Sequence, residues 1–353
     1  MMTNQSIGCK RKRYIWIDAV KIFACFLVVF GHLYMSMMSG GWIQESKIYY
    51  CWPVQTIYTF HVPLFFLCSG FLYQCTSKEW TLQEHRKNIQ KKFLALGVPY
   101  FTFSLITLIL KVVFSAEVNN QATPILKTLF IAPIAPYWYL YTLFFLFCFI
   151  PRFNDKKALR SCFVITIVLK LIYIIFLHTF NLPDIVSKVL ANAIWFVMGM
   201  ILTKSEIVKT KGKSLSCMIL FVIGISISYL FYKAPRNIAY IQFLVGICFV
   251  IPIIYFFIIK CENYKTLNMN KLGKYFMPVY VLHTIVAAMF RSVLLKIGIH
   301  SFIVHFFVGL IVSIMIPVVI YNLAEKKWFL LFWFEPMKAL KMKRGNNENY
   351  RIS

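Results

Sequence analysis

Three ionisable residues lie close together in a long apolar run near the start of the chain. Asp18, Lys21 and His32 fall within residues 14–38, which are otherwise mostly hydrophobic. A charge in the hydrocarbon core of a membrane is costly, so one that is retained there is a functional candidate. If the run is helical, His32 lies three turns beyond Lys21 on the same face, about 16 Å along the axis. Asp18 joins this face one turn before Lys21.

Such a stripe could support proton transfer inside a membrane, because histidine exchanges a proton near neutral pH. Structural roles remain open on the residues alone. Asp18 and Lys21 could form an ion pair near the interface, with the lysine stem snorkelling toward water. His32 could hydrogen-bond a neighbouring helix.

The composition indicates a membrane protein. The chain has 353 residues, of which 60% are hydrophobic and 14% charged, whereas soluble domains average about 25% charged. The apolar residues occur in runs of about 18 to 25, the length that a helix needs to cross about 30 Å of hydrocarbon. We expect an all-α fold, a polytopic membrane bundle of about ten transmembrane helices.

The fourth of the ten candidate spans is the weakest. Pro133 and Pro136 interrupt it, and the segment could instead be interfacial and followed by a short helix from Tyr137. The predicted spans are residues 14–38, 56–75, 93–115, 126–150, 162–180, 185–203, 215–232, 237–259, 275–295 and 301–322.

The net charge of +26 could indicate a nucleic-acid-binding protein, but its distribution argues against one. Most of the 38 Lys and Arg lie in alternate loops between apolar runs, which is the positive-inside pattern of membrane proteins. The pattern predicts that both termini are cytoplasmic. A basic N-terminus (1–13) and a basic tail (323–353) would flank a membrane domain (14–322).

The ten cysteines contain no CxxC pair, and most lie in apolar spans. Neither a disulfide framework nor a metal site is therefore expected. Three further charges, Lys111, Lys170 and Arg291, lie inside predicted spans, and the sequence assigns them no role.

Several segments resemble motifs of the membrane acyltransferase 3 family. The first-helix signature of that family is Arg or Lys, ten residues, then His, and Lys21 and His32 match it. Lysine stands where arginine is commoner, and it cannot make a bidentate contact. The resemblance spans 14–322, and its second-helix form is most similar to the branch of fucose O-acetylase-like glycan acetyltransferases. The matching segments are IDAVKIFACFLVVFGH, FHVPLFFLCSGFLY (60–73), KKFLALGVPY (91–100), YWYLYTLFF (137–145), WFVMGMIL (195–202) and VYVLH (279–283).

The resemblance implies a membrane O-acyltransferase. Its members move an acyl group, often acetyl, from a cytoplasmic acyl-CoA such as acetyl-CoA to a hydroxyl of a cell-envelope glycan or lipid-linked sugar. It implies a plasma-membrane location and no metal. His32 would be the general base that takes the hydroxyl proton. Lys21 would contact the acyl donor or, with Asp18, hold the site together.

Four basic residues precede the third span, namely Arg86, Lys87, Lys91 and Lys92. If the resemblance holds, they suit the phosphates of coenzyme A. The alternative, which the residues by themselves favour, is ordinary positive-inside charge.

His61 and Trp138 are candidates for binding the substrate. His61 could instead make a hydrogen bond between helices. Trp138 could belong to the aromatic belt at a membrane interface. His283, in VYVLH, has a counterpart in the family, and a packing role is equally open.

A membrane exporter or flippase of a polysaccharide or lipid-linked glycan is the main alternative. Such a transporter is expected to have broken helices in matched halves, and the sequence shows no internal repeat. A membrane sensor or polymerase is a third possibility, although such polymerases usually carry large outer loops and the predicted ones are short. The expected partners are acyl-CoA, a glycan or lipid-linked sugar and the lipid bilayer, with no nucleic acid.

Overall fold

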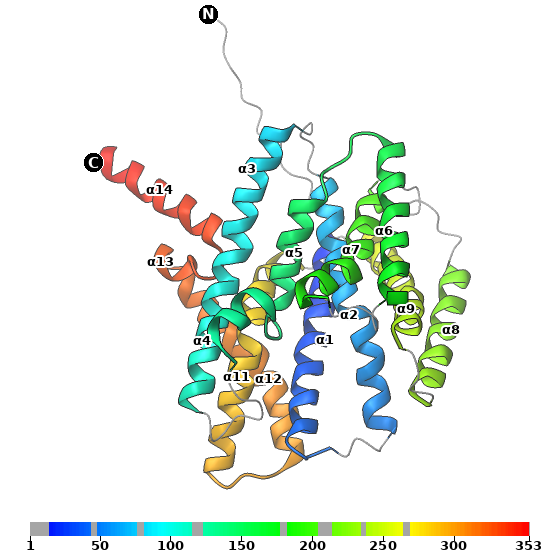
Figure 1. The fold of residues 1–353 in the computed structure, drawn as a ribbon. Helices are drawn as coiled ribbons and strands as arrows, with labels where there is room; N and C mark the ends of the chain where they lie inside the picture. Colours follow the sequence, from blue (N-terminus) through cyan, green and yellow to red (C-terminus); the bar gives the residue numbers. More distant parts are fainter. Residues whose placement is uncertain are drawn as a thin grey trace, which may run out of the picture.

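The chain is built from long helices that run side by side as a bundle (Figure 1). Among the residues that the structure describes, nine helices are long and apolar enough to cross a membrane. The protein is therefore a polytopic helical bundle and a multi-pass membrane protein, as the sequence predicts. The computed structural model describes residues 14–43, 48–75, 81–114, 123–176, 182–203, 214–233, 238–263 and 269–352.

The observed helices follow the predicted spans, with differences mainly at their ends. The elements are α1 (Ile15–Ser39), α2 (Ile48–Gln74), α3 (Leu82–Lys92), η1 (Phe93–Gly97), α4 (Val98–Val113), η2 (Lys127–Ile131), α5 (Trp138–Phe149), α6 (Lys156–Phe176), α7 (Asp184–Leu202), α8 (Ser214–Lys233), α9 (Ile238–Asn263), α10 (Met269–Leu272), η5 (Gly273–Tyr275), α11 (Phe276–Lys296), η6 (Val304–Val308), α12 (Gly309–Ala324), α13 (Trp328–Leu331) and α14 (Pro336–Ile352).

The fourth predicted span, residues 126–150, is not one continuous helix. It starts with the π-helix η2 and passes through Pro133 and Pro136 into α5, which has only 12 residues. Proline lacks a backbone N–H, and its ring clashes with the preceding turn, so the two prolines interrupt the helix. Tyr137 anchors the break to α11, because its hydroxyl donates to the carbonyl oxygen of Val281 at 3.0 Å.

Helices α2 and α7 cross at two glycines. A Cβ atom built on Gly70 would lie 1.9 Å from the carbonyl oxygen of Phe196, and one on Gly199 would lie 2.0 Å from that of Leu67. Neither position has space for a side chain, so the two backbones are in direct contact. Small residues at helix crossings are the usual means of close packing in membranes.

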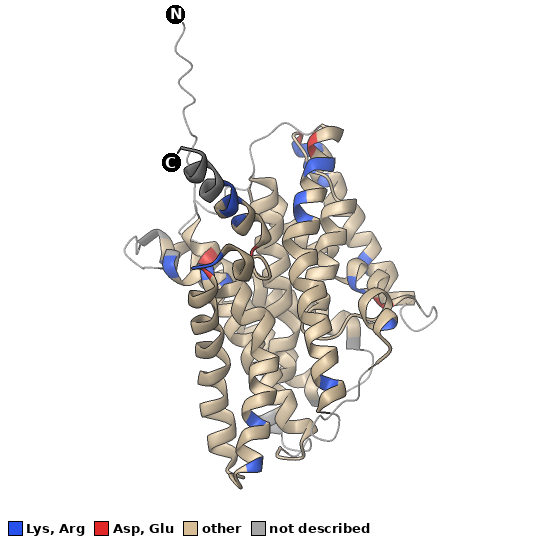
Figure 2. Cartoon of the chain, turned by 90° about the vertical axis from the view of Figure 1, so that its left-hand side faces the viewer, with Lys and Arg blue, Asp and Glu red and all other residues tan. Residues whose placement is uncertain are grey.

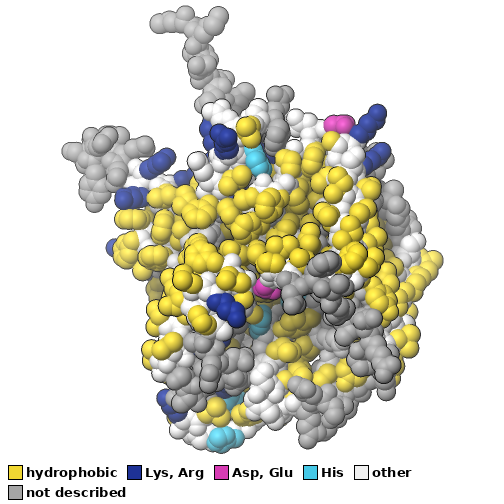
Figure 3. Space-filling model, in the orientation of Figure 1, with side chains coloured by type: hydrophobic (Ala, Val, Ile, Leu, Met, Phe, Trp, Pro, Cys, Tyr) yellow, Lys and Arg dark blue, Asp and Glu magenta, His cyan; other side chains and the backbone are white. Residues whose placement is uncertain are grey.

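The sides of the bundle are apolar. Large hydrophobic side chains are exposed along α6 and α8, such as Ile175 at 68% and Leu230 at 65%. The face in Figure 3 is mostly a band of hydrophobic side chains, with most of its visible Lys and Arg toward the top. A surface of this kind suits a lipid environment.

Lys and Arg gather toward the end of the bundle that carries α3, the first turn of α6 and α14 (Figure 2). We call this the basic end. The positive-inside pattern predicts that the basic end faces the cytoplasm.

Part of the chain after residue 322 packs on the bundle. Leu331 and Ala339 are buried in the same core as the spanning helices. Glu325 pairs with Lys338 of α14 at 2.6 Å and with Lys274 at 2.5 Å. Burial alone would raise the pKa of Glu325, but the two ammonium groups outweigh burial and lower it. This ion-pair cluster attaches α14 to the basic end.

Candidate functional site

A cavity of about 310 Å³ lies between α1, α2, α5, α6, α7, α9 and α11. Its volume is within the range of pockets that bind small molecules. Its wall combines imidazoles, aromatic rings, amides and an ammonium group, which suits a polar ligand with flat apolar faces. The lining residues include His32, Tyr58, His61, Trp138, Lys170 and Asn192.

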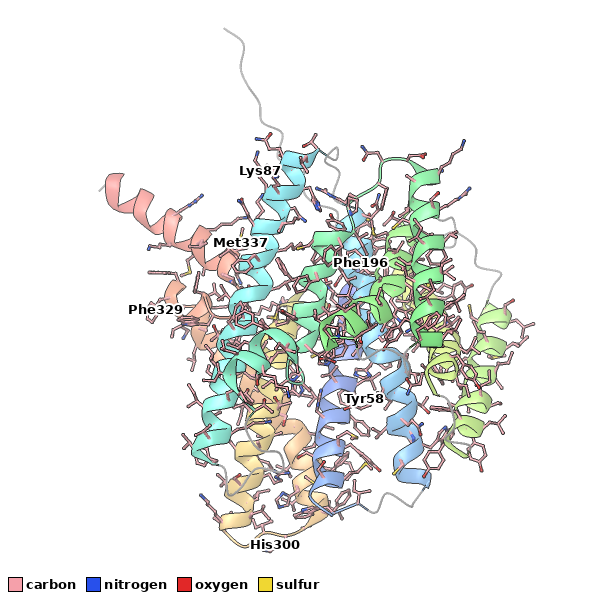
Figure 4. All side chains as sticks on the ribbon, in the orientation of Figure 1. Tyr58, Lys87, Phe196, His300, Phe329 and Met337 are labelled. Atoms are coloured by element: carbon pink, nitrogen blue, oxygen red, sulfur yellow. The ribbon has the colours of Figure 1, made fainter. Side chains whose placement is uncertain are left out.

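Helix α1 presents His32 to this cavity, beside His283 of α11. The two imidazole centroids are 5.3 Å apart. Gly31 lets Tyr58 of α2 pack closely beside His32, because a Cβ atom on Gly31 would lie only 2.9 Å from the Tyr58 ring. The centroids of the Tyr58 and His32 rings are 6.4 Å apart, and Figure 4 shows Tyr58 between α1 and α2. His32 is therefore held between an aromatic ring and a second imidazole.

The helix backbone fixes the tautomer of His283. Its Nδ1 lies 3.0 Å from the carbonyl oxygen of Val279 and 2.9 Å from that of Tyr280. Carbonyl oxygens only accept hydrogen bonds, so Nδ1 carries the hydrogen and donates it. Nε2 keeps its lone pair, and among the described residues this buried atom has no hydrogen-bond partner. His283 therefore places a buried acceptor next to His32.

His61 of α2 is oriented in the same way. Its Nδ1 donates to the carbonyl oxygen of Ile57 at 2.7 Å, so Nε2 is the acceptor nitrogen. The ring lines the cavity and lies 4.8 Å from the Tyr58 ring, centroid to centroid. The described hydrogen bond lies within α2, whereas the sequence left open a bond between helices.

Trp138 begins α5, directly after the proline interruption, and it also lines the cavity. The Nζ atom of Lys188 lies 5.2 Å from the centre of the Trp138 ring. Lys188 is paired with Asp184, one turn earlier on α7. The interrupted fourth span thus brings an indole ring to the wall of the cavity.

Lys21 and Asp18 are not among the residues around the cavity. Lys21 lies closer than His32 to the start of α1, and its Nζ is 5.9 Å from the centre of the Phe276 ring of α11. His32 also contacts α11, through His283. Lys21 and His32 therefore share the face of α1 that meets α11, as their spacing predicts. Asp18 lies half-buried in the first turn of α1.

The four candidates for binding the acyl donor lie on α3, outside the cavity. Arg86, Lys87 and Lys91 are exposed, and Lys92 is half-buried. The Nζ atom of Lys92 lies 4.1 Å from the centre of the Phe147 ring of α5. Figure 4 shows Lys87 at the basic end. These residues form a basic surface on α3, and their role in binding the donor stays a prediction.

The sequence did not identify Lys170 as a cavity residue. Its Nζ donates to the carbonyl oxygen of Ala191 at 3.0 Å and lies 5.4 Å from the ring centres of both Tyr173 and Phe243. The available signal was a lysine inside an apolar span, which is a functional candidate by default. The direction in which the Lys170 side chain points from its helix could not be predicted without knowing which helices surround it.

The other two charges inside spans do not line the cavity. Arg291 of α11 donates to the Ser36 hydroxyl of α1 at 2.7 Å. Lys111 is half-buried on α4. The hydrogen bond of Arg291 joins α11 to α1 one turn after His32 and so helps to hold these two helices together.

A comparison with protein-family models gives a match over most of the chain. Residues 14–322 match a model described as an acyltransferase domain. The matched region includes every cavity residue named above. The comparisons with curated proteins and with solved structures found no match.

Proposed function

Because the chain belongs to the membrane acyltransferase 3 family, we propose that this membrane acyltransferase moves an acetyl group from acetyl-CoA to a hydroxyl of a cell-envelope glycan. The observation that carries the proposal is the position of His32. It is an imidazole inside the bundle, on the wall of a cavity of about 310 Å³. The acetyl donor and the glycan acceptor rest on the motif resemblance and on the aromatic and amide groups of this wall.

His32 acts as the general base in this proposal. Its unprotonated nitrogen takes the proton of the acceptor hydroxyl as the oxygen attacks the thioester carbonyl carbon. The new C–O bond forms, and the C–S bond breaks. The imidazolium then returns the proton to the departing thiolate, so His32 ends the cycle neutral.

His283 and His61 support this step in different ways. The lone pair on Nε2 of His283 stabilises the imidazolium that forms on His32, because it offers a buried acceptor beside a ring that gains positive charge. Nε2 of His61 accepts a hydrogen bond from a second hydroxyl of the acceptor and so orients it. His283 is a positioning residue, whereas His61 binds substrate.

The acyl donor enters from the basic end, which we place in the cytoplasm of the cell. Lys91 and its neighbours on α3 bind the phosphates of coenzyme A. Lys21 lies on α1 between the basic end and His32, on the face that meets α11, and it contacts the donor along this path. The acceptor reaches the cavity from the opposite side of the plasma membrane.

An exporter without transferase activity explains these observations less well. The family match is to an acyltransferase domain. Export also gives no reason for the pair of imidazoles in the bundle, in which His283 lies beside His32 and has its tautomer fixed by the helix backbone.

Mass spectrometry of the surface polysaccharide tests the proposal. Cells with the protein should carry acetyl groups on this glycan that are missing from cells without it. The variant His32→Ala should accumulate in membranes and leave the glycan unacetylated. His300→Ala is a matched control, because His300 is exposed and is not among the residues that line the cavity. Figure 4 shows His300 at the end of the bundle opposite Lys87. Normal acetylation in the His32→Ala strain would defeat the assignment of the base.

A further inference from the structure

Lys170 has no part in the transfer step described above, although it lines the same cavity. Its side chain is buried, with 8% of the residue exposed. An ammonium group has three hydrogens to donate. The described part of the chain provides one hydrogen-bond acceptor, the carbonyl oxygen of Ala191 at 3.0 Å. Two donor positions of Lys170 are therefore available to a ligand.

No carboxylate among the described residues pairs with Lys170. Asp184, at the start of the neighbouring helix α7, is paired with Lys188. The rings of Tyr173 and Phe243 lie near the ammonium group, but aromatic rings compensate a buried charge only in part. A buried charge is normally paired, so a counter-charge for Lys170 is missing from the described wall.

The groups around Lys170 are those that recognise an acidic sugar. Trp138 and Trp195 give the cavity aromatic faces, and Asn192 and Gln242 contribute amides to its wall. Amides hydrogen-bond hydroxyl groups, and indole rings pack on the C–H faces of a sugar ring. A lysine binds carboxylate or phosphate oxygens as a point charge.

We propose that the acceptor bound in this cavity carries an anionic group, either a carboxylate or a phosphate, which Lys170 binds by charge-assisted hydrogen bonds. Naming this ligand the acceptor rests on the proposed function. The anion site itself depends only on Lys170 and the cavity. A sugar acid would supply a carboxylate, and a sugar phosphate or the phosphate of a lipid-linked sugar would supply a phosphate.

Binding of matched sugars to the purified full-length protein in lipid nanodiscs tests the site. Each set contains a neutral hexose, its uronic acid and its 6-phosphate, with glucose, galactose and mannose as the parent sugars. Tryptophan fluorescence reports binding, because Trp138 and Trp195 line the cavity. At least one anionic member should bind about 10- to 100-fold more tightly than its neutral parent, as expected for hydrogen bonds to a charged group. The preferred member distinguishes carboxylate from phosphate.

Substitution of the lysine provides the second arm. Lys170→Met should remove the preference for the anion and leave the affinity for the neutral parent unchanged, while Lys170→Arg should keep most of the preference. Lys111→Met is the matched control, because Lys111 also lies in a spanning helix but outside the cavity. It should bind all sugars as the wild type does.

Three results would overturn the proposal. The first is a wild-type protein that shows no anion preference in any set, which decides the matter even if Lys170→Met does not fold. The second is an anion preference that Lys170→Met retains. The third is an equal loss of preference in Lys111→Met. If the preference depends on Lys170 but the surface glycan carries the same acetylation in cells with and without the protein, the anion site stands and the proposed function fails. If acetylation of the surface glycan depends on the protein but the purified protein shows no anion preference, the proposed function stands and the anion site fails.

Discussion

The crossing of α2 and α7 predicts that Gly70→Ala will damage both stability and activity. The new Cβ atom would lie 1.9 Å from the carbonyl oxygen of Phe196, whereas real Cβ contacts are essentially never shorter than 3.0 Å. The helices must therefore separate by about 1 Å, since a backbone carbonyl cannot rotate away as a side chain does. Overpacking of this kind costs about 1–3 kcal/mol or more.

The separation should also disturb the cavity. Helix α2 carries His61, and α7 carries Asn192 and Trp195. A misplacement of about 1 Å at a reacting site can lower the rate about 100-fold. We therefore expect Gly70→Ala to lower the unfolding temperature and to reduce acyl transfer by about this factor.

Thermal unfolding in detergent and transfer of labelled acetyl measure the two effects. Gly309→Ala is the control, because its Cβ would meet Leu33 at 3.6 Å, which is an ordinary contact. The double variant Gly70→Ala/Gly199→Ala should cost less than the sum of the single variants, because both Cβ atoms clash at the same crossing and the separation that one forces also makes room for the other. A Gly70→Ala protein with wild-type stability and activity would refute the reasoning.

Two further predictions concern charged groups at the basic end. Lys91→Ala together with Lys92→Ala should raise the acetyl-CoA concentration needed for half-maximal transfer without changing the acceptor requirement. The exposed pair Lys156 and Lys157, replaced in the same way, is the control; equal effects of the two pairs would mean that α3 does not bind the donor. Glu325→Gln should destabilise the protein by about 1 kcal/mol at neutral pH, as expected for partly exposed ion pairs. Because the pKa of this carboxyl lies below its usual 4.5, its contribution is complete above pH 4.5 and is lost as the pH falls through the lowered pKa. The check is the unfolding temperature of the wild type and of Glu325→Gln, measured from neutral pH down through the lowered pKa. A difference between the two unfolding temperatures that does not shrink as the pH falls would contradict the ion-pair account.

The spans could be predicted from the sequence because hydrocarbon thickness sets helix length directly. Residues 185–203 predict α7 (Asp184–Leu202), and 275–295 predict α11 (Phe276–Lys296), each within one residue. The extension of α2 back to Ile48 was missed. The polar and aromatic residues of that first stretch weaken the hydropathy signal, although the backbone remains helical.

The interrupted fourth span was recognised for a local reason. Pro133 and Pro136 act on their own turn of helix, so their effect is visible in the sequence. The consequence of the interruption for the site could not be predicted from the sequence. That the break would bring Trp138 to a cavity shared with α1 and α2 depends on contacts between helices far apart in the chain.

The candidate site was predicted only as far as single helices allow. Helical spacing places Lys21 and His32 on one face of α1. Which neighbour that face would meet is a property of the assembled bundle, and the answer is α11, through Phe276 and His283. The convergence of His32, His61 and Lys170 on one cavity likewise needed the packing of three helices.

Transfer of an isotope from acetyl-CoA to the glycan by the purified protein tests the central claim most directly. The protein in nanodiscs is mixed with acetyl-CoA labelled in the acetyl carbonyl and with surface glycan from cells that lack the protein, and label on the glycan is measured by mass spectrometry. We predict transfer by the wild type and a rate about 100- to 10,000-fold lower for His32→Ala, the range expected for loss of a general base. Transfer at the wild-type rate by His32→Ala would contradict the account.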